Sequence, residues 1–212
     1  MKLLEGDRAL VTGTGNGIGK GIAAALEQEG ATVLRADIQN ADVQCDLSTA
    51  AGAKKLAEDA IRRLGTVSIF VHSASPRRQE SQTVLEATEA EWREMLAVNL
   101  DAAFILAQAL GRHMVEKTIK GRMLLTTSLH AESPRRIPHY SAAKAGETML
   151  VKELARALGP HGIRVNAVAP GAIPGGGFQA PPGMVEKIPL RRFGTPADVA
   201  AMAVAVLSER FG

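Results

Sequence analysis

The sequence predicts an α/β protein in which a parallel sheet is covered by helices on both faces. Short apolar runs that favour strands alternate along the chain with segments whose apolar residues recur at helical spacing. This alternation is typical of a doubly wound parallel sheet. No long linker and no repeat interrupts the pattern, so we expect residues 1–212 to form a single domain.

The expected elements follow in order from the N-terminus. A first strand at residues 8–12 runs into a glycine-rich turn, and the helix after it ends at Gly30. Further strands are expected at residues 32–37, 68–72, 122–127 and 163–169. Further helices are expected at residues 50–64, about 89–116, about 141–158 and 196–207. The Gly- and Pro-rich segment 170–183 predicts a mobile loop near the functional site.

Composition argues against several classes of function. Hydrophobic residues make up 46% of the 212 residues and charged residues 22%, and the formal net charge is +3. The basic residues are scattered, and five Phe, one Tyr and one Trp are the only aromatics, so we expect no nucleic-acid partner. Cys45 is the only cysteine, and no two histidines have the spacing of a helical metal site. We therefore expect neither a disulfide nor a bound metal.

The N-terminal segment also bears on where the protein acts. The segment MKLLEGDRALVTG contains no apolar signal core. We also expect no apolar stretch that approaches the roughly 20 residues of a membrane span. The sequence therefore predicts a cytoplasmic protein without a membrane partner.

A glycine-rich turn connects the first strand to the first helix. Gly13, Gly17 and Gly19 would let the backbone approach a pyrophosphate, and the helix N-terminus offers free N–H groups. A tight turn without a ligand remains an alternative on this pattern alone. Asp37, at the end of the second strand, strengthens the case for a dinucleotide. A carboxylate there accepts both hydroxyls of an adenosine ribose and repels a 2′-phosphate.

The charges around this turn favour NAD over NADP. Asn16 leaves the turn without a basic side chain that would attract a 2′-phosphate. Arg35 is a counterweight, but it lies two residues upstream of Asp37 on the strand, so we expect it deeper under the sheet edge.

Ser128, Tyr140 and Lys144 form the candidate catalytic group. Tyr140 and Lys144 are four residues apart at the start of a helix, so both face the same side. A free phenol, with a pKa of about 10, is a poor base near neutrality, but an ammonium within roughly 4–6 Å favours the phenolate. Ser128 follows the end of a strand and could hydrogen-bond a substrate oxygen. An ordinary surface tyrosine with an i,i+4 lysine remains the alternative for the helical pair.

Seven segments in this order resemble the short-chain dehydrogenase/reductase family, whose members have a Rossmann fold. They are spread over most of the chain: TGTGNGIG (12–19), CDLS (45–48), VNL with Asn99, TTS (126–128), YSAAK (140–144), RVNAVAPGAI (164–173) and PLRRFGTPADVA (189–200). The resemblance implies that Tyr140 is the catalytic acid and base, assisted by Lys144, that Ser128 orients the substrate, and that Asn99 supports a water relay to Lys144. It further implies cofactor contacts at Gly13, Asn16, Gly17, Ile18, Gly19, Asp37, Asp46, Leu47, Ala74, Ser75, Asn99, Tyr140, Lys144, Pro170, Gly171 and Ile173.

The chain departs from the family pattern at several positions. Where the family has Asn-Asn-Ala-Gly after the fourth strand, this chain has residues 72–75 as His-Ser-Ala-Ser, so Ser75 would crowd or hydrogen-bond the cofactor. Gly175 replaces a threonine that normally contacts the nicotinamide. Residues 38–45 leave no room for the usual helix. The family's last strand would follow Gly212, so we expect about six strands in the order 3-2-1-4-5-6, with one edge unpaired or covered by a partner.

Three arginine pairs bear on the substrate: Arg77-Arg78, Arg135-Arg136 and Arg191-Arg192. Arginine grips carboxylate and phosphate in a bidentate manner, so an anionic small-molecule substrate is one interpretation. Solvated surface charge or subunit contacts is the other.

The sequence thus predicts an NAD-dependent oxidoreductase that moves hydride between nicotinamide and a secondary alcohol or ketone. A 3-oxoacyl-[acyl-carrier-protein] reductase and a non-catalytic dinucleotide-binding regulator remain alternatives. The helices around residues 96–109 and 142–154 resemble those of the family's four-helix interface, which implies a homo-oligomer, either dimer or tetramer.

Overall fold

Six parallel strands form one sheet in the order β3-β2-β1-β4-β5-β6 in the computed structural model, which describes residues 2–77, 82–175, 178 and 180–211. This order confirms the prediction. The strands are β1 (Arg8–Thr12), β2 (Thr32–Asp37), β3 (Val43–Gln44), β4 (Ile69–His72), β5 (Arg122–Thr126) and β6 (Arg164–Val168). Because all six run in the same direction, their carboxyl ends meet at one edge of the sheet, where open α/β sheets hold their ligands.

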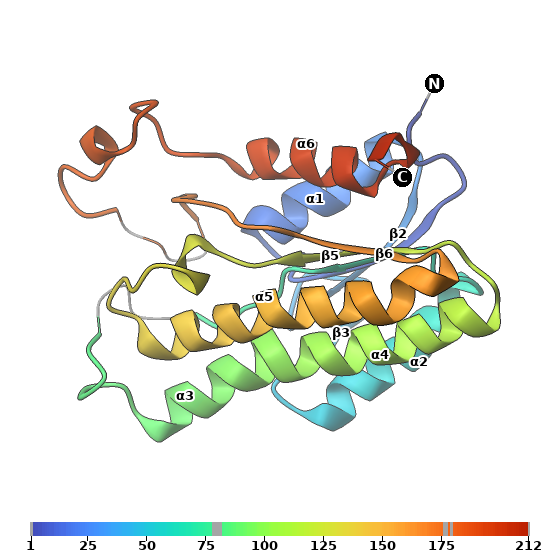
Figure 1. The fold of residues 1–212 in the computed structure, drawn as a ribbon, viewed down its shortest axis with the longest axis horizontal. Coiled ribbons are helices and arrows are strands. Elements are labelled where there is room, and N and C mark those ends of the chain that lie inside the picture. The colour runs from blue at the N-terminus through green and yellow to red at the C-terminus, as the bar shows by residue number, and fades with distance from the viewer. Residues whose placement is uncertain (1, 78–81, 176–177, 179, 212) are drawn as a thin grey trace.

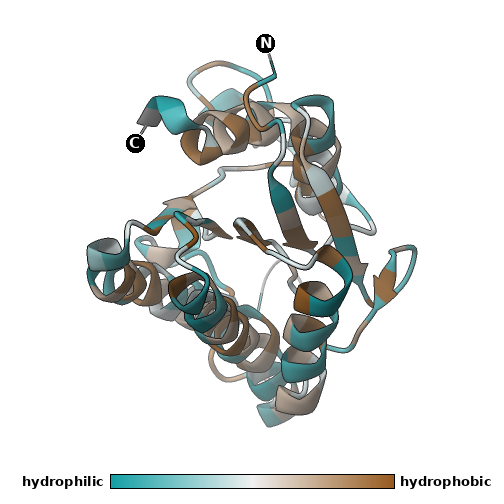
Figure 2. Ribbon diagram, turned by 90° about the vertical axis from the view of Figure 1, so that its right-hand side faces the viewer, coloured by the Kyte–Doolittle hydropathy of each residue, from teal (hydrophilic) through white to brown (hydrophobic). Residues whose placement is uncertain are grey.

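Helices cover both faces of the sheet (Figures 1 and 2). One face carries α1 (Gly17–Gln28) and α6 (Pro196–Leu207), which pack against each other. The other face carries α2 (Ala50–Leu64), α4 (Ala102–Glu116) and α5 (Pro138–Leu158). α3 (Glu89–Leu96) continues into α4 through η1 (Ala97–Asp101), a π-helical segment.

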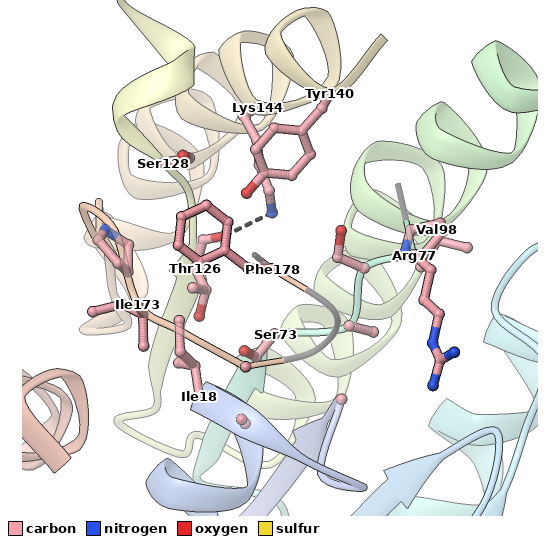
Figure 3. Close-up of a pocket in the computed structure, with 18 of the residues that line it drawn as sticks. Ile18, Ser73, Arg77, Val98, Thr126, Ser128, Tyr140, Lys144, Ile173 and Phe178 are labelled. Atoms are coloured by element: carbon pink, nitrogen blue, oxygen red, sulfur yellow. Dashed lines mark hydrogen bonds between the residues drawn. The ribbon is translucent and has the colours of Figure 1, made fainter. Parts of the chain in front are cut away.

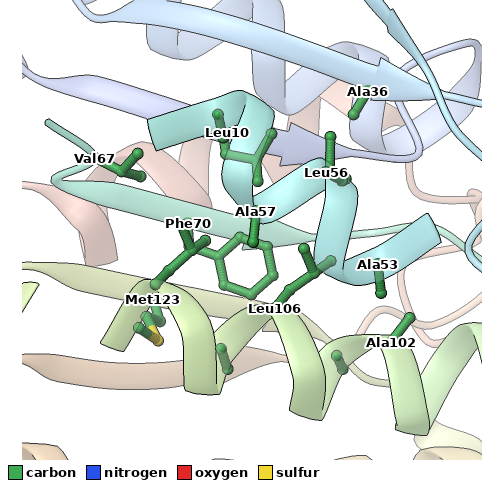
Figure 4. Packing of buried hydrophobic residues seen from close by; sticks show 14 of the residues in the cluster. Leu10, Ala36, Ala53, Leu56, Ala57, Val67, Phe70, Ala102, Leu106 and Met123 are labelled. Atoms are coloured by element: carbon green, nitrogen blue, oxygen red, sulfur yellow. The ribbon is translucent and has the colours of Figure 1, made fainter. Parts of the chain in front are cut away.

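Two apolar cores lie on the two faces of the sheet. On the side of α2 and α4, the side chain of Phe70 from β4 is fully buried among Leu10, Leu56, Leu106 and Met123 (Figure 4). Burying a side chain of this kind contributes about 1.5–3 kcal/mol. The second core lies between the sheet and the α1–α6 pair. Because β4 and β5 are buried along their whole length, both are apolar on both faces except at their ends, where His72, Arg122 and Thr126 lie.

The structure differs from the sequence prediction in a few elements. The long helix expected at about 89–116 is interrupted by the π-helical η1. α5 begins at Pro138 rather than near Ser141, because proline suits the first helical position. The two-residue β3 is too short to give a periodic signal. The chain between β2 and β3 forms only bends, so the expectation that no helix fits there is confirmed.

One expectation about apolar stretches is wrong. Glu89–Glu116 is long and apolar enough to cross a membrane, as judged by length and composition alone. In the structure the side chains of Leu106, Leu110 and Met114 from this segment are fully buried in the core on the α2 side of the sheet. A helix that supplies side chains to a protein core has this composition for that reason.

Candidate active site

A cavity of about 800 Å³ opens at the carboxyl ends of the strands (Figure 3). It reaches from Asp37 at the end of β2, past the turn after β1, to Tyr140 and Lys144 on α5. The loop after β6 closes one side through residues such as Ile173 and Phe178. The expectation that the Gly- and Pro-rich segment lies near the site is therefore confirmed.

The turn after β1 needs glycine for two different reasons. At Gly13, φ is +74°, and a side-chain Cβ would lie 2.6 Å from the backbone of Ser73 and Ala74. At Gly19 a Cβ would lie only 2.1 Å from the carbonyl oxygen of Gly13, so a side chain would push helix and strand apart. Gly17, with φ of +56°, has open space where its Cβ would be, and it lines the cavity. The first two glycines therefore serve close packing, whereas the third leaves room for a ligand.

The carboxylate of Asp37, at the end of β2, is hydrogen-bonded to the turn after β1. Its Oδ2 accepts a hydrogen bond from the N–H of Gly15 at 2.9 Å, and its Oδ1 accepts one from the N–H of Ile38 at 2.7 Å. Arg35 lies away from this carboxylate, because its guanidinium pairs with Glu27 of α1 at 2.6 Å. This contact also raises the pKa of Arg35, mainly through its hydrogen bond to Glu27. The only basic side chain that the sequence placed near Asp37 is thus engaged elsewhere.

Ser128, Tyr140 and Lys144 come together in the cavity (Figure 3). The Lys144 Nζ lies 5.7 Å from the centre of the Tyr140 ring. The Ser128 Oγ accepts a hydrogen bond from the N–H of His130 at 3.2 Å, which leaves its own O–H to donate into the cavity. The His130 ring meets the Tyr140 ring edge-on, with centroids 5.1 Å apart, and so restricts where the phenol can lie. Proton transfer to a substrate oxygen requires that Ser128, Tyr140 and Lys144 lie close together in this way.

A buried carboxylate that the sequence analysis missed touches this group. The Lys144 Nζ donates to the carbonyl oxygen of Thr126 and to Oε2 of Glu147, both at 2.7 Å. The Glu147 side chain is fully buried. Burial raises the pKa of its carboxyl to about 7, while Lys144 acts in the opposite direction. The only signal in the sequence was a glutamate three residues after Lys144 on the same helix.

His72 connects the turn to the π-helical segment. One ring nitrogen lies 3.0 Å from Oγ1 of Thr12, and the other lies 3.0 Å from the carbonyl oxygen of Val98. The side chain is fully buried, and burial together with the charge of Lys144 lowers its pKa to about 3. His72 is therefore neutral in the working range of pH and serves as a hydrogen-bonding brace between β1, β4 and η1.

The family model described as enoyl-(acyl carrier protein) reductase matches residues 13–212. Glucose 1-dehydrogenase 2 of Bacillus subtilis (strain 168) is 32% identical over 233 residues, covering 98% of this chain and 90% of that protein. The human (3R)-3-hydroxyacyl-CoA dehydrogenase is 31% identical over 234 residues, covering 96% and 89%. A short-chain type dehydrogenase/reductase from Mycobacterium marinum superposes with a TM-score of 0.86, at 28% identity, covering 97% and 89%.

The chain belongs to the short-chain dehydrogenase/reductase family. As a member of this family it is an oxidoreductase that uses NAD or NADP and acts on a small molecule at a hydroxyl or carbonyl group. An enzyme is therefore favoured over a non-catalytic dinucleotide-binding regulator.

The residues present fit the family's dinucleotide. Open space at Gly17, a carboxylate at Asp37 and an ammonium at Lys144 follow one another along the same cavity. Every predicted cofactor position except Asn99 lines it: Gly13, Asn16, Gly17, Ile18, Gly19, Asp37, Asp46, Leu47, Ala74, Ser75, Tyr140, Lys144, Pro170, Gly171 and Ile173. Gly175, which also departs from the family pattern, lines it as well.

Asn99 is the predicted site residue that the structure does not bring to the cavity lining. It is fully buried in η1, where its Nδ2 donates to the carbonyl oxygen of Met95 at 3.0 Å. Among the described residues its Oδ1 has no hydrogen-bond partner. That oxygen is an acceptor that a buried water could use. The water relay from Asn99 to Lys144 stays a prediction.

The arginine pairs divide between the cavity and the surface. Arg77 and Arg135 line the cavity, and Glu94 places a negative charge in the same wall. Arg78 lies outside the described residues. Arg136 does not line the cavity, and its carbonyl oxygen accepts from the N–H of Gln82.

The third pair lies away from the cavity altogether. Arg191 donates to the carbonyl oxygen of Glu186, and Arg192 pairs with Asp198 at 2.8 Å. Nearby acceptors hold both guanidinium groups outside the cavity, which favours the surface-charge interpretation for Arg191 and Arg192.

Proposed function

We propose that this enzyme transfers hydride between NAD and a secondary alcohol or ketone, with Tyr140 as the proton donor and acceptor. The observation that carries the proposal is that the Tyr140 phenol, the Ser128 hydroxyl and the Lys144 ammonium converge on one cavity that begins at Asp37. A phenol beside an ammonium can give up and regain a proton, which a phenol in water does poorly near neutral pH.

Each side chain has a distinct task in this proposal. Ser128 donates a hydrogen bond to the substrate oxygen and fixes its position. Tyr140 gives its phenolic proton to that oxygen during reduction and takes it back during oxidation. Lys144 supports the negative form of the phenol and holds the nicotinamide ribose through an N–H that its protein partners leave over. When bound, the nicotinamide supplies or accepts the hydride at the substrate carbon.

The direct test is a panel of secondary alcohols and ketones. Oxidation is followed by the appearance of NADH at alkaline pH, and reduction by its disappearance near neutral pH. Turnover of members of the panel supports the proposal. Dinucleotide binding without any turnover would contradict it and would favour the regulator.

We propose that NAD is the cofactor, and Asp37 supplies the prediction that tests this choice. Asp37→Asn keeps an acceptor for the Gly15 N–H but removes the charge that repels a 2′-phosphate. We expect the preference for NADH over NADPH, measured as a ratio of Kd values, to fall by about tenfold, which corresponds to about 1.4 kcal/mol. Tighter binding of NADPH than of NADH to the unmodified protein would show that the assignment is wrong.

The substrate is either a neutral alcohol or ketone or an anionic, carrier-linked compound, and a variant of Arg135 distinguishes these two classes. A 3-oxoacyl group on an acidic carrier is the second candidate, because a relative of similar length is a hydroxyacyl-CoA dehydrogenase and because Arg77 and Arg135 line the cavity. An anionic substrate would be attracted by these exposed guanidinium groups, whereas a neutral alcohol would not.

We predict that Arg135→Ala raises KM for a carboxylate- or carrier-linked substrate by about threefold to tenfold, and that added salt shrinks the difference. Arg192→Ala is the matched control, since Arg192 is paired with Asp198 outside the cavity. Equal effects of Arg135→Ala on neutral and anionic substrates would leave Arg135 as surface charge.

We further propose that the protein is a homo-oligomer, joined through α4 and α5. These helices lie side by side (Figure 1), and each exposes a large apolar side chain: Phe104 is 46% exposed and Met149 is 54% exposed. Light scattering should report a dimer or a tetramer, and Phe104→Glu should shift it toward the monomer because it places a charge in an apolar contact. A monomer at micromolar concentration in the unmodified protein would contradict this prediction.

A further inference from the structure

A buried ion pair lies directly behind the proposed proton donor. The Lys144 Nζ and the Glu147 Oε2 are 2.7 Å apart, and the two side chains are 3% and 0% exposed. Lys144 lines the cavity, whereas Glu147 does not. A lysine ammonium has three N–H groups, and Thr126 and Glu147 accept two of them. Because these two hydrogen bonds fix the ammonium, the third N–H group points in a fixed direction.

Burying the Glu147 carboxylate at this position costs free energy of folding. Among the described residues its second carboxylate oxygen, Oε1, has no hydrogen-bond partner. A buried ion pair is often no more stable than apolar side chains of the same volume. Stability alone therefore does not explain a glutamate at this position.

The charge of Glu147 acts on Tyr140 through Lys144. An ammonium near a phenol favours the phenolate, and a carboxylate that cancels the ammonium weakens this effect. Since the pKa of Glu147 is raised to about 7, its carboxyl is ionised at the alkaline pH where a phenol loses its proton. At that pH the pair is close to neutral as a unit.

We propose that Glu147 is a positioning residue that partly neutralises Lys144 and thereby keeps Tyr140 protonated to higher pH. The protonated phenol is the state that gives a proton to a carbonyl oxygen, so the device favours the reductive direction at neutral pH. This inference rests on the proposed role of Tyr140 in proton transfer.

Other ionisable groups lie on the elements packed around α5 or line the cavity, but none of them replaces Glu147. His72, on β4, is held neutral by burial. The remaining groups lie on the helices and loops around α5 or on the cavity wall: His130 on η2 (Leu129–Ala131), His139 on α5, Glu91 and Glu94 on α3, Asp101 on η1, and Arg77 and Arg135. Among the described residues none of these forms a salt bridge with Lys144.

The chain offers a direct measurement, because Tyr140 is its only tyrosine. The near-ultraviolet absorbance of phenolate therefore reports the ionisation of this one side chain, without substrate or cofactor. The unmodified protein and Glu147→Gln are titrated from neutral to alkaline pH. Glu153→Gln is the matched control, since it makes the same change at an exposed position of the same helix. Tyr140→Phe, which has no phenol, gives the background absorbance that is subtracted.

We expect the midpoint of Tyr140 ionisation to fall by about one pH unit in Glu147→Gln, because the amide can still accept from Lys144 but carries no charge. Glu153→Gln should leave the midpoint unchanged. An unchanged or higher midpoint in Glu147→Gln would overturn the proposal.

Two further variants cover other outcomes. If Glu147→Gln does not fold, Glu147→Met removes the same charge without burying a polar group and should lower the midpoint in the same direction; no decrease there would also overturn the proposal. In a Lys144→Met background, Glu147→Gln should shift the midpoint by much less, because the carboxylate then has no ammonium to neutralise. A full shift in that background would show that Glu147 does not act through Lys144.

The proposed function can fail separately from this inference. Turnover by Tyr140→Phe would remove the role of Tyr140 in proton transfer, whatever the titration shows. An unshifted titration together with an inactive Tyr140→Phe would remove only the role of Glu147.

Discussion

Tyr140→Phe should lower kcat/KM by about a thousandfold in both directions, the scale of a lost general acid or base. The change removes one oxygen and leaves the ring that packs against His130, so the fold should keep its stability. NADH should bind with nearly the same Kd, because the phenol transfers a proton and contributes little to holding the cofactor. Steady-state kinetics on a substrate from the panel and a fluorescence titration with NADH measure the two quantities.

The separation between turnover and binding is the important part of this result. A variant that loses both to the same degree would point to a damaged cavity rather than a missing proton donor. Activity within tenfold of the unmodified enzyme would contradict the assignment of Tyr140.

Lys144→Met should have the second large effect, because it should lower both the activity and the stability of the protein. Activity should drop by at least about a hundredfold, because the phenolate loses its ammonium. The free energy of unfolding should drop by about 3 kcal/mol near pH 8, because Glu147 remains buried without a charged partner. Urea unfolding measures this loss.

The stability loss should depend on pH in a definite direction. The pKa of Glu147 is already raised by burial, and removing Lys144 takes away what opposes that rise. In the unfolded chain the carboxyl ionises near its ordinary pKa of about 4.3. As pH rises above that value the unfolded state releases a proton that the folded variant retains, so the variant becomes less stable with rising pH. The penalty should be small near pH 4 and large near pH 8.

Two controls separate charge from packing in this experiment. Lys152→Met makes the same change at an exposed position of α5 and should cost little. The double variant Lys144→Met with Glu147→Met should regain stability at about pH 8 without regaining activity, since it removes the buried carboxyl that has lost its partner. If Lys144→Met lowers the free energy of unfolding by the same amount at low and high pH, lost packing rather than the buried carboxyl is responsible.

Local patterns in the sequence were enough to predict the parallel sheet, the glycine-rich turn and the catalytic group, whereas the strand order and most of the cavity lining were predicted from the resemblance to the family. The turn at Gly13, Gly17 and Gly19 and the four-residue spacing of Tyr140 and Lys144 depend only on nearby residues and on the periodicity of one helix. In an alternating α/β chain, the carboxyl ends of the strands then have to meet at one edge. For this reason Asp37, Ser128 and Tyr140 could be assigned to one site from the sequence.

Only the tertiary structure decided the environment of these residues. His72 connects Thr12 to Val98 because β4 pairs with β1 and packs against η1, contacts between residues far apart in the sequence. The sequence displays the Lys144–Glu147 spacing, but the same spacing on an exposed helix would be a weak surface pair. Packing of α5 against α3, η1 and β6 buries it, and burial turns an ordinary i,i+3 pair into one that can act on Tyr140.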